Sequence, residues 1–231
     1  MAGTPEAELK RLEEELVKLA AFPREELEYI IREIGFSCSL CGRCCTKEYN
    51  GHVFLLAKDT ARVKEFAKDA IVPAPGFPYS DAGGNFYVSG YALKTKENGD
   101  CIFLENNRCT IYEKRFAICR LYPYMLHREK DARGHLDWRM ISGLGEHGSY
   151  ENEIGDEDVR KIADDTFAYE TGYLVQEILF HKFLLKTFAA RGEKFVRRDH
   201  DARTRAFQKS GQAVVYVFDG EKFVREVVNA P

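Results

Sequence analysis

Apolar positions near the N-terminus recur at helical spacing and predict a pair of amphipathic helices over residues 1–35. The first helix begins with Thr4 as N-cap and Pro5 as its first residue, and the second begins at Pro23 and ends at Gly35. Spacings of three and four residues define one apolar face on each helix: Leu9, Leu12, Leu16 and Leu19, then Leu27, Ile30, Ile31 and Ile34. We expect this pair to pack on the rest of the protein, with a partner-binding arm as the alternative, because isolated helices of this length are marginal in water.

The middle of the chain alternates short apolar runs with loops. Strands are predicted over residues 53–57, 85–93 and 136–141, and residues 71–85 are predicted as irregular loop because they are rich in Pro and Gly. A helix capped by Asp59 or Thr60 is expected to reach about Ala70, with Val63 and Phe66 on its inner side. Residues 100–112 are typical of a hairpin that turns at 105–108, and a short helix should follow over 112–120.

The C-terminal third predicts a long helix and a β-hairpin. The helix runs from Asp156 to about Arg191, with Gly172 as a candidate break. Strands over 213–218 and 222–228 flank Asp219-Gly220, which indicates a two-residue turn. We therefore predict an α+β fold in three parts: an N-terminal helical hairpin (1–35), a cysteine-rich, loop-dominated metal-binding core (36–150), and a helix with a C-terminal β-hairpin packed on that core (151–231).

Composition excludes several classes of protein. Hydrophobic residues make up 45% of the 231 positions, enough for a packed core, and 34 basic against 37 acidic residues argue against a nucleic-acid binder. The most apolar segment, residues 173–188, is interrupted by charged residues, so no membrane span is expected. The N-terminus carries no run typical of an export signal. We expect a soluble cytoplasmic protein.

Seven cysteines carry the chemical information. Their number is odd, and Cys38, Cys41, Cys44 and Cys45 lie within eight residues, a pattern unlike a secreted disulfide framework. Thiolates held this close repel one another unless a cation compensates their charge, so the cluster indicates a metal. Consecutive side chains of an extended segment point to opposite sides. We therefore expect Cys44 and Cys45 to serve different positions: two metals, one bridged centre, or a ligand beside a non-ligand thiol, with a vicinal disulfide as the remaining alternative.

A second group of cysteines follows in one compact stretch: Cys101, Cys109 and Cys119. On an extended hairpin the first two would stand about 13 Å apart along the strands. The last two would flank the predicted short helix and close on a centre from its two ends. Burial of an ordinary free thiol is the alternative for each of them. With seven thiols in two clusters, metal ligation by most of them is the favoured interpretation.

These blocks resemble the YkgJ-type cysteine-cluster family, the zinc- or iron-chelating CxxCxxCC domain. The resemblance covers about residues 36–125 and rests on Cys38 to Cys45, Cys101-Ile-Phe-Leu, Cys109-Thr-Ile-Tyr-Glu with Arg115, and Cys119-Arg-Leu-Tyr-Pro. Phe116 stands where the family has Pro. The resemblance implies a metal centre held by these cysteines. Members are often described as iron–sulfur oxidoreductases or metal chelators without an assigned reaction, and a related set resembles flagellin lysine methylases.

The thiol count favours an iron–sulfur cluster, a 4Fe-4S cubane in particular, over zinc. A structural zinc takes four ligands, whereas a cubane would be held by three cysteines of the first block with Cys119 or Cys109. Cys45 and Cys101 would then lie beside the cluster or belong to another site. An apolar shell and three arginines are expected around the sulfurs: Leu40, Phe103, Leu104, Tyr112, Phe116 and Tyr122, with Arg43, Arg115 and Arg120.

Other signals are weaker. Residues 143–148 match G-x-G-x-x-G, but no helix follows to hold a pyrophosphate. An imidazole could be added to the metal site by any of three histidines: His127, His135 and His147. The leading hypothesis is an iron–sulfur protein that acts in electron transfer or as an accessory or maturation factor, with an unidentified protein or redox partner. A zinc-stapled interaction domain and a metal-dependent protein methyltransferase are the alternatives, and whether the protein is an enzyme, such as an iron–sulfur oxidoreductase, stays open.

Overall fold

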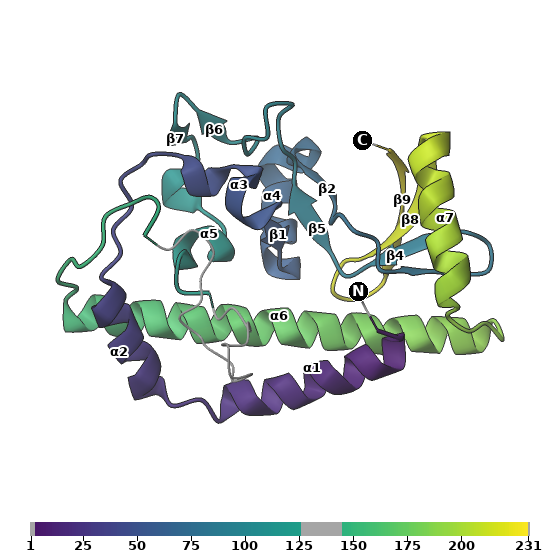
Figure 1. The fold of residues 1–231 in the computed structure, drawn as a ribbon, viewed down its shortest axis with the longest axis horizontal. Helices are drawn as coiled ribbons and strands as arrows, with labels where there is room; N and C mark the ends of the chain where they lie inside the picture. The colour runs from purple at the N-terminus through teal and green to yellow at the C-terminus, as the bar shows by residue number, and fades with distance from the viewer. Residues whose placement is uncertain (1–2, 126–144, 231) are drawn as a thin grey trace. The chain divides into compact units, whose positions relative to one another are not determined.

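The computed structural model describes residues 3–125 and 145–230 and divides into two compact units. Unit 1 is formed by residues 1–17, 54–92 and 173–231, and unit 2 by residues 18–53 and 93–172. The fold is α+β as predicted, with small sheets, a long helix and a C-terminal hairpin (Figure 1). The three-part division expected from the sequence stays a prediction. In the described part of the chain no helix is both long and apolar enough to cross a membrane.

Both N-terminal helices form where their end signals predict. Helix α1 (Pro5–Ala20) is capped by Thr4, whose hydroxyl accepts a hydrogen bond of 3.3 Å from the N–H of Ala7. Helix α2 (Arg24–Ile34) ends at Gly35, which has the left-handed conformation (φ 52°) and donates its N–H to Ile31. Within unit 2, α2 buries Leu27, Ile30 and Ile31, so this helix is part of a packed unit and not a free arm.

Short elements make up most of unit 2 around the cysteines. They are η1 (Arg43–Cys45), α3 (Lys47–Asn50), β6 (Leu104–Glu105), β7 (Arg108–Cys109), η3 (Tyr112–Lys114) and α5 (Ala117–Leu121). The β6–β7 hairpin turns at Asn106 and Asn107, both at positive φ, as predicted. The single helix expected over 112–120 is instead two short ones, because the backbone of Arg115 and Phe116 is extended between them.

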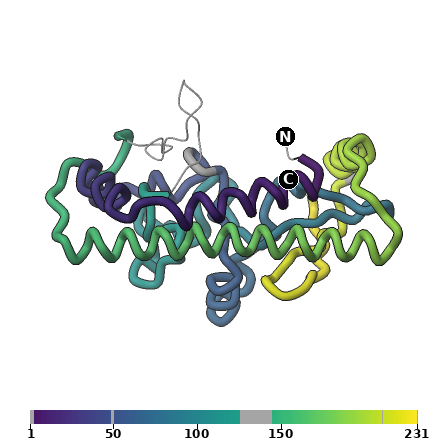
Figure 2. Tube along the Cα trace, turned by 90° about the horizontal axis from the view of Figure 1, so that it is seen from below, coloured from purple at the N-terminus to yellow at the C-terminus, as the bar shows by residue number. Residues whose placement is uncertain are grey.

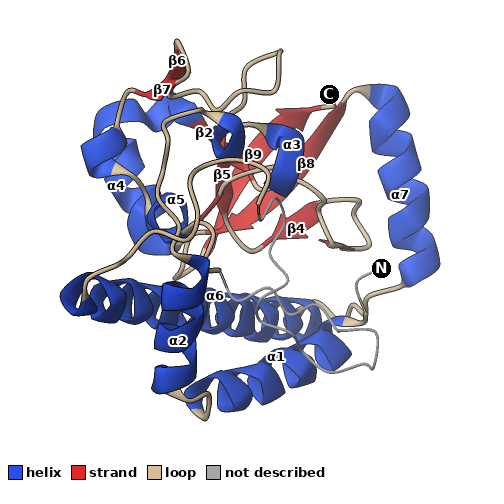
Figure 3. Cartoon of the chain, turned by 60° about the vertical axis from the view of Figure 1, so that its left-hand side comes forward, coloured by secondary structure: helices blue, strands red, loops and turns tan. Residues whose placement is uncertain are grey.

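Unit 1 contains a four-stranded sheet of order β3-β4-β8-β9 (Figure 3). Its strands are β3 (Tyr79–Ser80), β4 (Phe86–Val88), β8 (Gln212–Phe218) and β9 (Phe223–Asn229). The C-terminal hairpin is confirmed, but its two-residue turn is wrong. Phe218 pairs with Phe223, and the four residues between them are held by Asp219, whose carboxylate accepts the N–H groups of Glu221 and Lys222. Strand β4 runs parallel to β8, a long-range pairing that the sequence did not indicate.

The remaining strands lie where two strands, over 53–57 and 85–93, and one loop were expected. Strands β1 (Phe54–Leu55), β5 (Tyr91–Leu93) and β2 (Ile71–Pro73) form a second sheet in the order β1-β5-β2. The predicted strand over 85–93 is broken at Gly90, where a Cβ would lie 2.8 Å from Nε2 of Gln176. The predicted loop over 71–85 contains β2, which lies beside β5, and β3, which pairs with the next strand, β4.

Among the described residues, three further helices differ from expectation. Helix α4 (Ala57–Ala67) has Leu56 as its N-cap, three residues before the expected Asp59, and continues into η2 (Lys68–Ala70), and Phe66 on it is 49% exposed and not inward-facing. Helix α6 (Asp156–Ala190) runs without a break at Gly172, as its continuous trace in Figure 2 shows. Helix α7 (Arg197–Ser210) was not predicted, because its sequence is strongly charged and offers few apolar positions. The strand expected over 136–141 lies outside the described residues.

Candidate metal centre

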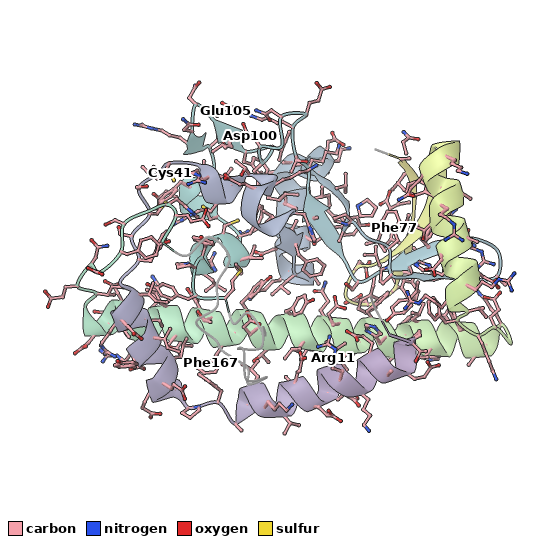
Figure 4. All side chains as sticks on the ribbon, viewed as in Figure 1. Arg11, Cys41, Phe77, Asp100, Glu105 and Phe167 are labelled. Atoms are coloured by element: carbon pink, nitrogen blue, oxygen red, sulfur yellow. The ribbon has the colours of Figure 1, made fainter. Side chains whose placement is uncertain are left out.

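All seven cysteines line one cavity of unit 2. The cavity measures about 90 Å³, which is room for several water molecules. Cys41 is exposed and the other six thiols are half-buried; Figure 4 labels Cys41 on the loop that precedes α3. The two cysteine blocks, which are separated by more than fifty residues of sequence, therefore line the same cavity.

A tight helical turn brings the first block together. Gly42 takes a positive φ of 78°, and Cys45 donates its N–H to the Gly42 carbonyl over 2.9 Å. Cys44 and Cys45 thus sit in η1 and not in an extended segment, and their expected service of different positions stays a prediction. Both line the same cavity, and a hydrogen bond joins their thiols.

The second block is tied to the first through the backbone. Cys101 donates its N–H to the carbonyl of Cys45 over 2.8 Å. The chain then turns at once, with Leu104 donating to the carbonyl of Cys101, so Cys101 lies outside the β6–β7 hairpin and the strand spacing of about 13 Å does not apply. Cys109 ends β7 and Cys119 lies in α5, and both line the cavity beside Cys101.

The thiols act on one another electrostatically. A hydrogen bond with Cys44 and burial raise the pKa of Cys45, and the neighbouring Cys41 adds to this shift. Burial raises the pKa of Cys101 to about 11, with contributions from Cys45 and Cys109. Burial likewise raises the pKa of Cys119. Neutral thiols are therefore favoured here until a cation compensates the thiolates.

Hydrogen-bond donors that point at the sulfurs act to lower the pKa values of the thiols. Burial would raise the pKa of Cys41, but hydrogen bonds from the N–H groups of Arg43 and Gly148 and the side chain of Ser39 bring it below its usual value. Backbone hydrogen bonds from Phe103 and Ile111 similarly favour the thiolates of Cys101 and Cys109. Such N–H groups are the partners that metal-bound sulfurs accept in cysteine-ligated centres.

The rest of the wall matches the expected shell in most respects. All six apolar residues predicted for it line the cavity: Leu40, Phe103, Leu104, Tyr112, Phe116 and Tyr122. Arg115 lines it too, with its guanidinium 3.7 Å from the centre of the Tyr112 ring, and its charge favours the thiolates of Cys45, Cys109 and Cys119. Arg43 instead pairs with Glu48 at 2.7 Å, and Arg120 binds the Arg115 carbonyl at 2.8 Å.

Two histidines complete the lining. His147, one of the three considered from the sequence, is 7% exposed and lines the cavity, whereas His127 and His135 lie outside the described residues. His52 also lines it and was missed; its place seven residues after Cys45 is the signal that could have found it. Residues 145–149 of the G-x-G-x-x-G stretch form a turn and a bridge, with no helix before Asp156, which agrees with the rejection of a dinucleotide loop. Gly143 lies outside the described residues.

Within residues 3–125 and 145–230, no group of three or more His, Cys, Asp or Glu side chains is already close enough to hold a metal ion. Rotation about the Cα–Cβ bond moves a cysteine sulfur between staggered rotamers. Binding of an ion requires the thiols to change rotamer in this way. Their chemistry fits the group: thiolate sulfur is the preferred ligand of zinc and of iron–sulfur clusters. The seven cysteines are therefore the residues that could hold a metal.

Comparison with known proteins agrees with this donor set. Residues 37–139 match the sequence model of the CxxCxxCC family, described as "Putative zinc- or iron-chelating domain". An uncharacterized protein of Methanocaldococcus jannaschii, MJ0661, is 29% identical over 112 residues, which cover 46% of this chain and 54% of that protein. The chain thus spans about half the length of this curated relative. No solved structure matches this chain. On the motif, its cavity and this match, residues 37–139 resemble the zinc- or iron-chelating CxxCxxCC domain, and the protein carries a candidate metal-binding site.

Proposed function

We propose that the cysteines hold an iron–sulfur cluster and that the protein acts in electron transfer or as an accessory factor in metal or redox handling. The observation that carries this proposal is the convergence of seven thiols on one cavity of about 90 Å³. A structural zinc site is complete with four ligands. Seven thiols leave three to bridge, to exchange, or to surround a cluster.

The surroundings of the sulfurs support a redox centre. Hydrogen bonds to cluster sulfurs and the exclusion of water both tune reduction potential. Here N–H groups of Arg43, Gly148, Phe103 and Ile111 reach three of the cysteines, and aromatic side chains line the cavity. A bound cluster would supply a one-electron redox couple.

Individual residues take distinct roles under this proposal. Cys38, Cys41 and Cys44, with Cys109 or Cys119, are the ligands that the spacing favours. Cys45 contributes to the raised pKa of each of three other thiols, Cys101, Cys109 and Cys119. Arg115 offsets the negative charge of the thiolates.

The alternatives fit the cavity less well. A methyl-donor nucleotide needs a pocket of several hundred Å³, so the cysteine cavity does not suit the methyltransferase alternative. A zinc-stapled domain needs only four of these seven cysteines as ligands. The assay below separates zinc from a cluster.

Anaerobic purification followed by iron, zinc and acid-labile sulfide analysis tests the proposal. We expect a brown protein with iron and sulfide in near-equal amounts and a visible absorption that bleaches on reduction. Phe66→Ala, which changes an exposed side chain of α4 in unit 1, should keep this composition. Stoichiometric zinc without sulfide would overturn the cluster, and protein without any metal after reconstitution would overturn metal binding altogether.

A further inference from the structure

A loop beyond the family match forms part of the cysteine cavity. Residues 145–149 follow the end of the matched segment at residue 139, yet His147 and Gly148 line the same cavity as the seven thiols. The loop is anchored to the cysteine block by an antiparallel bridge between Ser37 and Ser149, with N–H···O distances of 2.7 and 2.9 Å. Arg43 also binds the carbonyl of Glu146 at 2.8 Å.

One residue of this loop reaches a cysteine directly. The N–H of Gly148 donates a hydrogen bond to the thiol of Cys41. Gly148 has a φ of +83°, and a Cβ there would lie 2.2 Å from a carbon of the Phe36 ring. Only glycine meets both conditions, because a side chain would strain the backbone and collide with the ring. The loop is thus held at the rim of the cavity by position-specific contacts.

Aromatic side chains then fix the neighbouring imidazole. The His147 ring stacks on Tyr122, with ring centres 5.1 Å apart and planes inclined by 26°. Tyr122 in turn packs edge-on against Phe36 at 5.5 Å. Stacking covers the face of an imidazole but not its nitrogen lone pair, which lies in the ring plane. The stacked Tyr122 ring therefore does not cover the in-plane nitrogens of this buried imidazole, which lines the cavity.

We propose that His147 is an imidazole ligand of the metal centre, placed by the 145–149 loop and added to the cysteine ligands. The inference rests on the proposed metal centre and extends it to a residue outside the family match. Imidazole is the commonest protein ligand of metals, and mixed sulfur–nitrogen sets suit both zinc and iron–sulfur centres. His147 would make the centre more oxidising than an all-thiolate one, as histidine ligands do in Rieske clusters.

X-ray absorption at the metal edge of the anaerobically purified full chain tests this ligand. Wild type should show a nitrogen scatterer at about 2.0–2.1 Å beside sulfurs at about 2.3 Å if zinc is bound, and a short nitrogen scatterer beside sulfurs if iron is bound. His147→Ala should lose the nitrogen, and His147→Cys should replace it with sulfur. His200→Gln is the control, because His200 is a buried histidine of unit 1 that does not line the cavity, and it should retain the nitrogen. Loss of the nitrogen in His52→Ala would overturn the assignment to His147, because His52 lines the same cavity.

Two readouts keep the inference separate from the metal centre itself. For a redox-active centre, His147→Cys should lower the reduction potential and His200→Gln, in unit 1, should leave it unchanged. An all-sulfur wild-type centre, or a nitrogen scatterer that persists in His147→Ala, would overturn the inference while metal binding stands. Wild-type protein that takes up no iron or zinc would overturn the metal centre and the ligand together. If His147→Ala does not fold, nitrogen hyperfine coupling from ¹⁵N-labelled histidine should be present in a paramagnetic wild-type centre and persist in His52→Ala, and its absence from wild type would overturn the inference.

Discussion

The hydroxyl of Tyr79 lies 3.0 Å from Nε2 of His181 in unit 1. The other ring nitrogen, Nδ1, lies 2.7 Å from the carbonyl oxygen of Glu177, which can only accept, so Nδ1 carries a proton. Burial lowers the pKa of His181 and keeps the ring neutral. Nε2 is therefore an acceptor, and Tyr79 donates to it. The two side chains are 1% and 2% exposed, so each depends on the other for this hydrogen bond.

Removing that donor should destabilise the protein. Tyr79→Phe leaves Nε2 of His181 buried without its donor, and we expect a loss of about 1–3 kcal/mol in the free energy of unfolding. Urea denaturation at neutral pH measures it. Tyr29→Phe, at a position 63% exposed, is the control and should change stability little. Equal midpoints for the two variants would contradict this arrangement.

Glu177 should make stability depend on pH. Burial raises the pKa of this carboxyl to about 7, above its ordinary value of 4.5. Between those two values the folded state holds the proton more tightly than the unfolded state, so wild type loses stability as pH rises from about 4.5 to 7. Glu177→Gln cannot ionise and should gain stability relative to wild type at pH 8.

Denaturant titrations of wild type and Glu177→Gln at pH 5 and pH 8 test this sign. The difference between the two proteins should be larger at pH 8. Glu221→Gln, in the exposed loop between β8 and β9, should show no such pH-dependent difference. A Glu177→Gln variant that is less stable than wild type at pH 8 would contradict the raised pKa.

Alanine substitutions at two glycines of one loop distinguish the cost of backbone strain from the cost of a steric clash. Gly148 and Gly145 both have positive φ, +83° and +79°, but a Cβ meets Phe36 at Gly148 and no atom within 4 Å at Gly145. Gly145→Ala should cost about 1 kcal/mol from the left-handed backbone alone. Gly148→Ala should cost more and should lower metal content, because the loop must move away from Cys41. Thermal unfolding with metal analysis measures both, and equal losses would argue against the contact with Phe36.

Cysteine variants should differ in how much metal they retain. Cys41 is one of the favoured ligands and, despite burial, its pKa is lowered by hydrogen bonds, whereas Cys45 is not among the favoured ligands and its pKa is raised. We expect Cys41→Ser to lose most of the bound metal and Cys45→Ser to retain a larger share. Metal per chain after anaerobic purification gives the comparison. The reverse order would show that Cys45 belongs to the ligand set and Cys41 does not.

Elements governed by neighbouring residues could be predicted. Thr4 and Gly35 place the ends of α1 and α2 through hydrogen bonds that span only three or four residues. The turn at Asn106-Asn107 likewise follows from residues that tolerate positive φ. The parallel pairing of β4 with β8 joins residues 86–88 to 215–217, and no local pattern encodes such a partner. Helix α7 was missed for a related reason, since Phe207 packs on Phe77 and Phe86 from distant segments.

The candidate site likewise has features that the sequence predicts and features that depend on contacts between distant segments. Thiol number and the C-x2-C-x2-C-C spacing were enough to indicate a metal site and its apolar shell, because ligand chemistry depends on residue type and short spacing. Which residues meet around one cavity was decided by the fold. The 3₁₀ turn at Gly42 set Cys44 and Cys45 on the same wall, the chain reversal after Cys101 removed the expected separation from Cys109, and a loop from residues 145–149 brought in His147. Those outcomes depend on backbone hydrogen bonds and ring packing between segments that can lie more than a hundred residues apart, which sequence spacing does not contain.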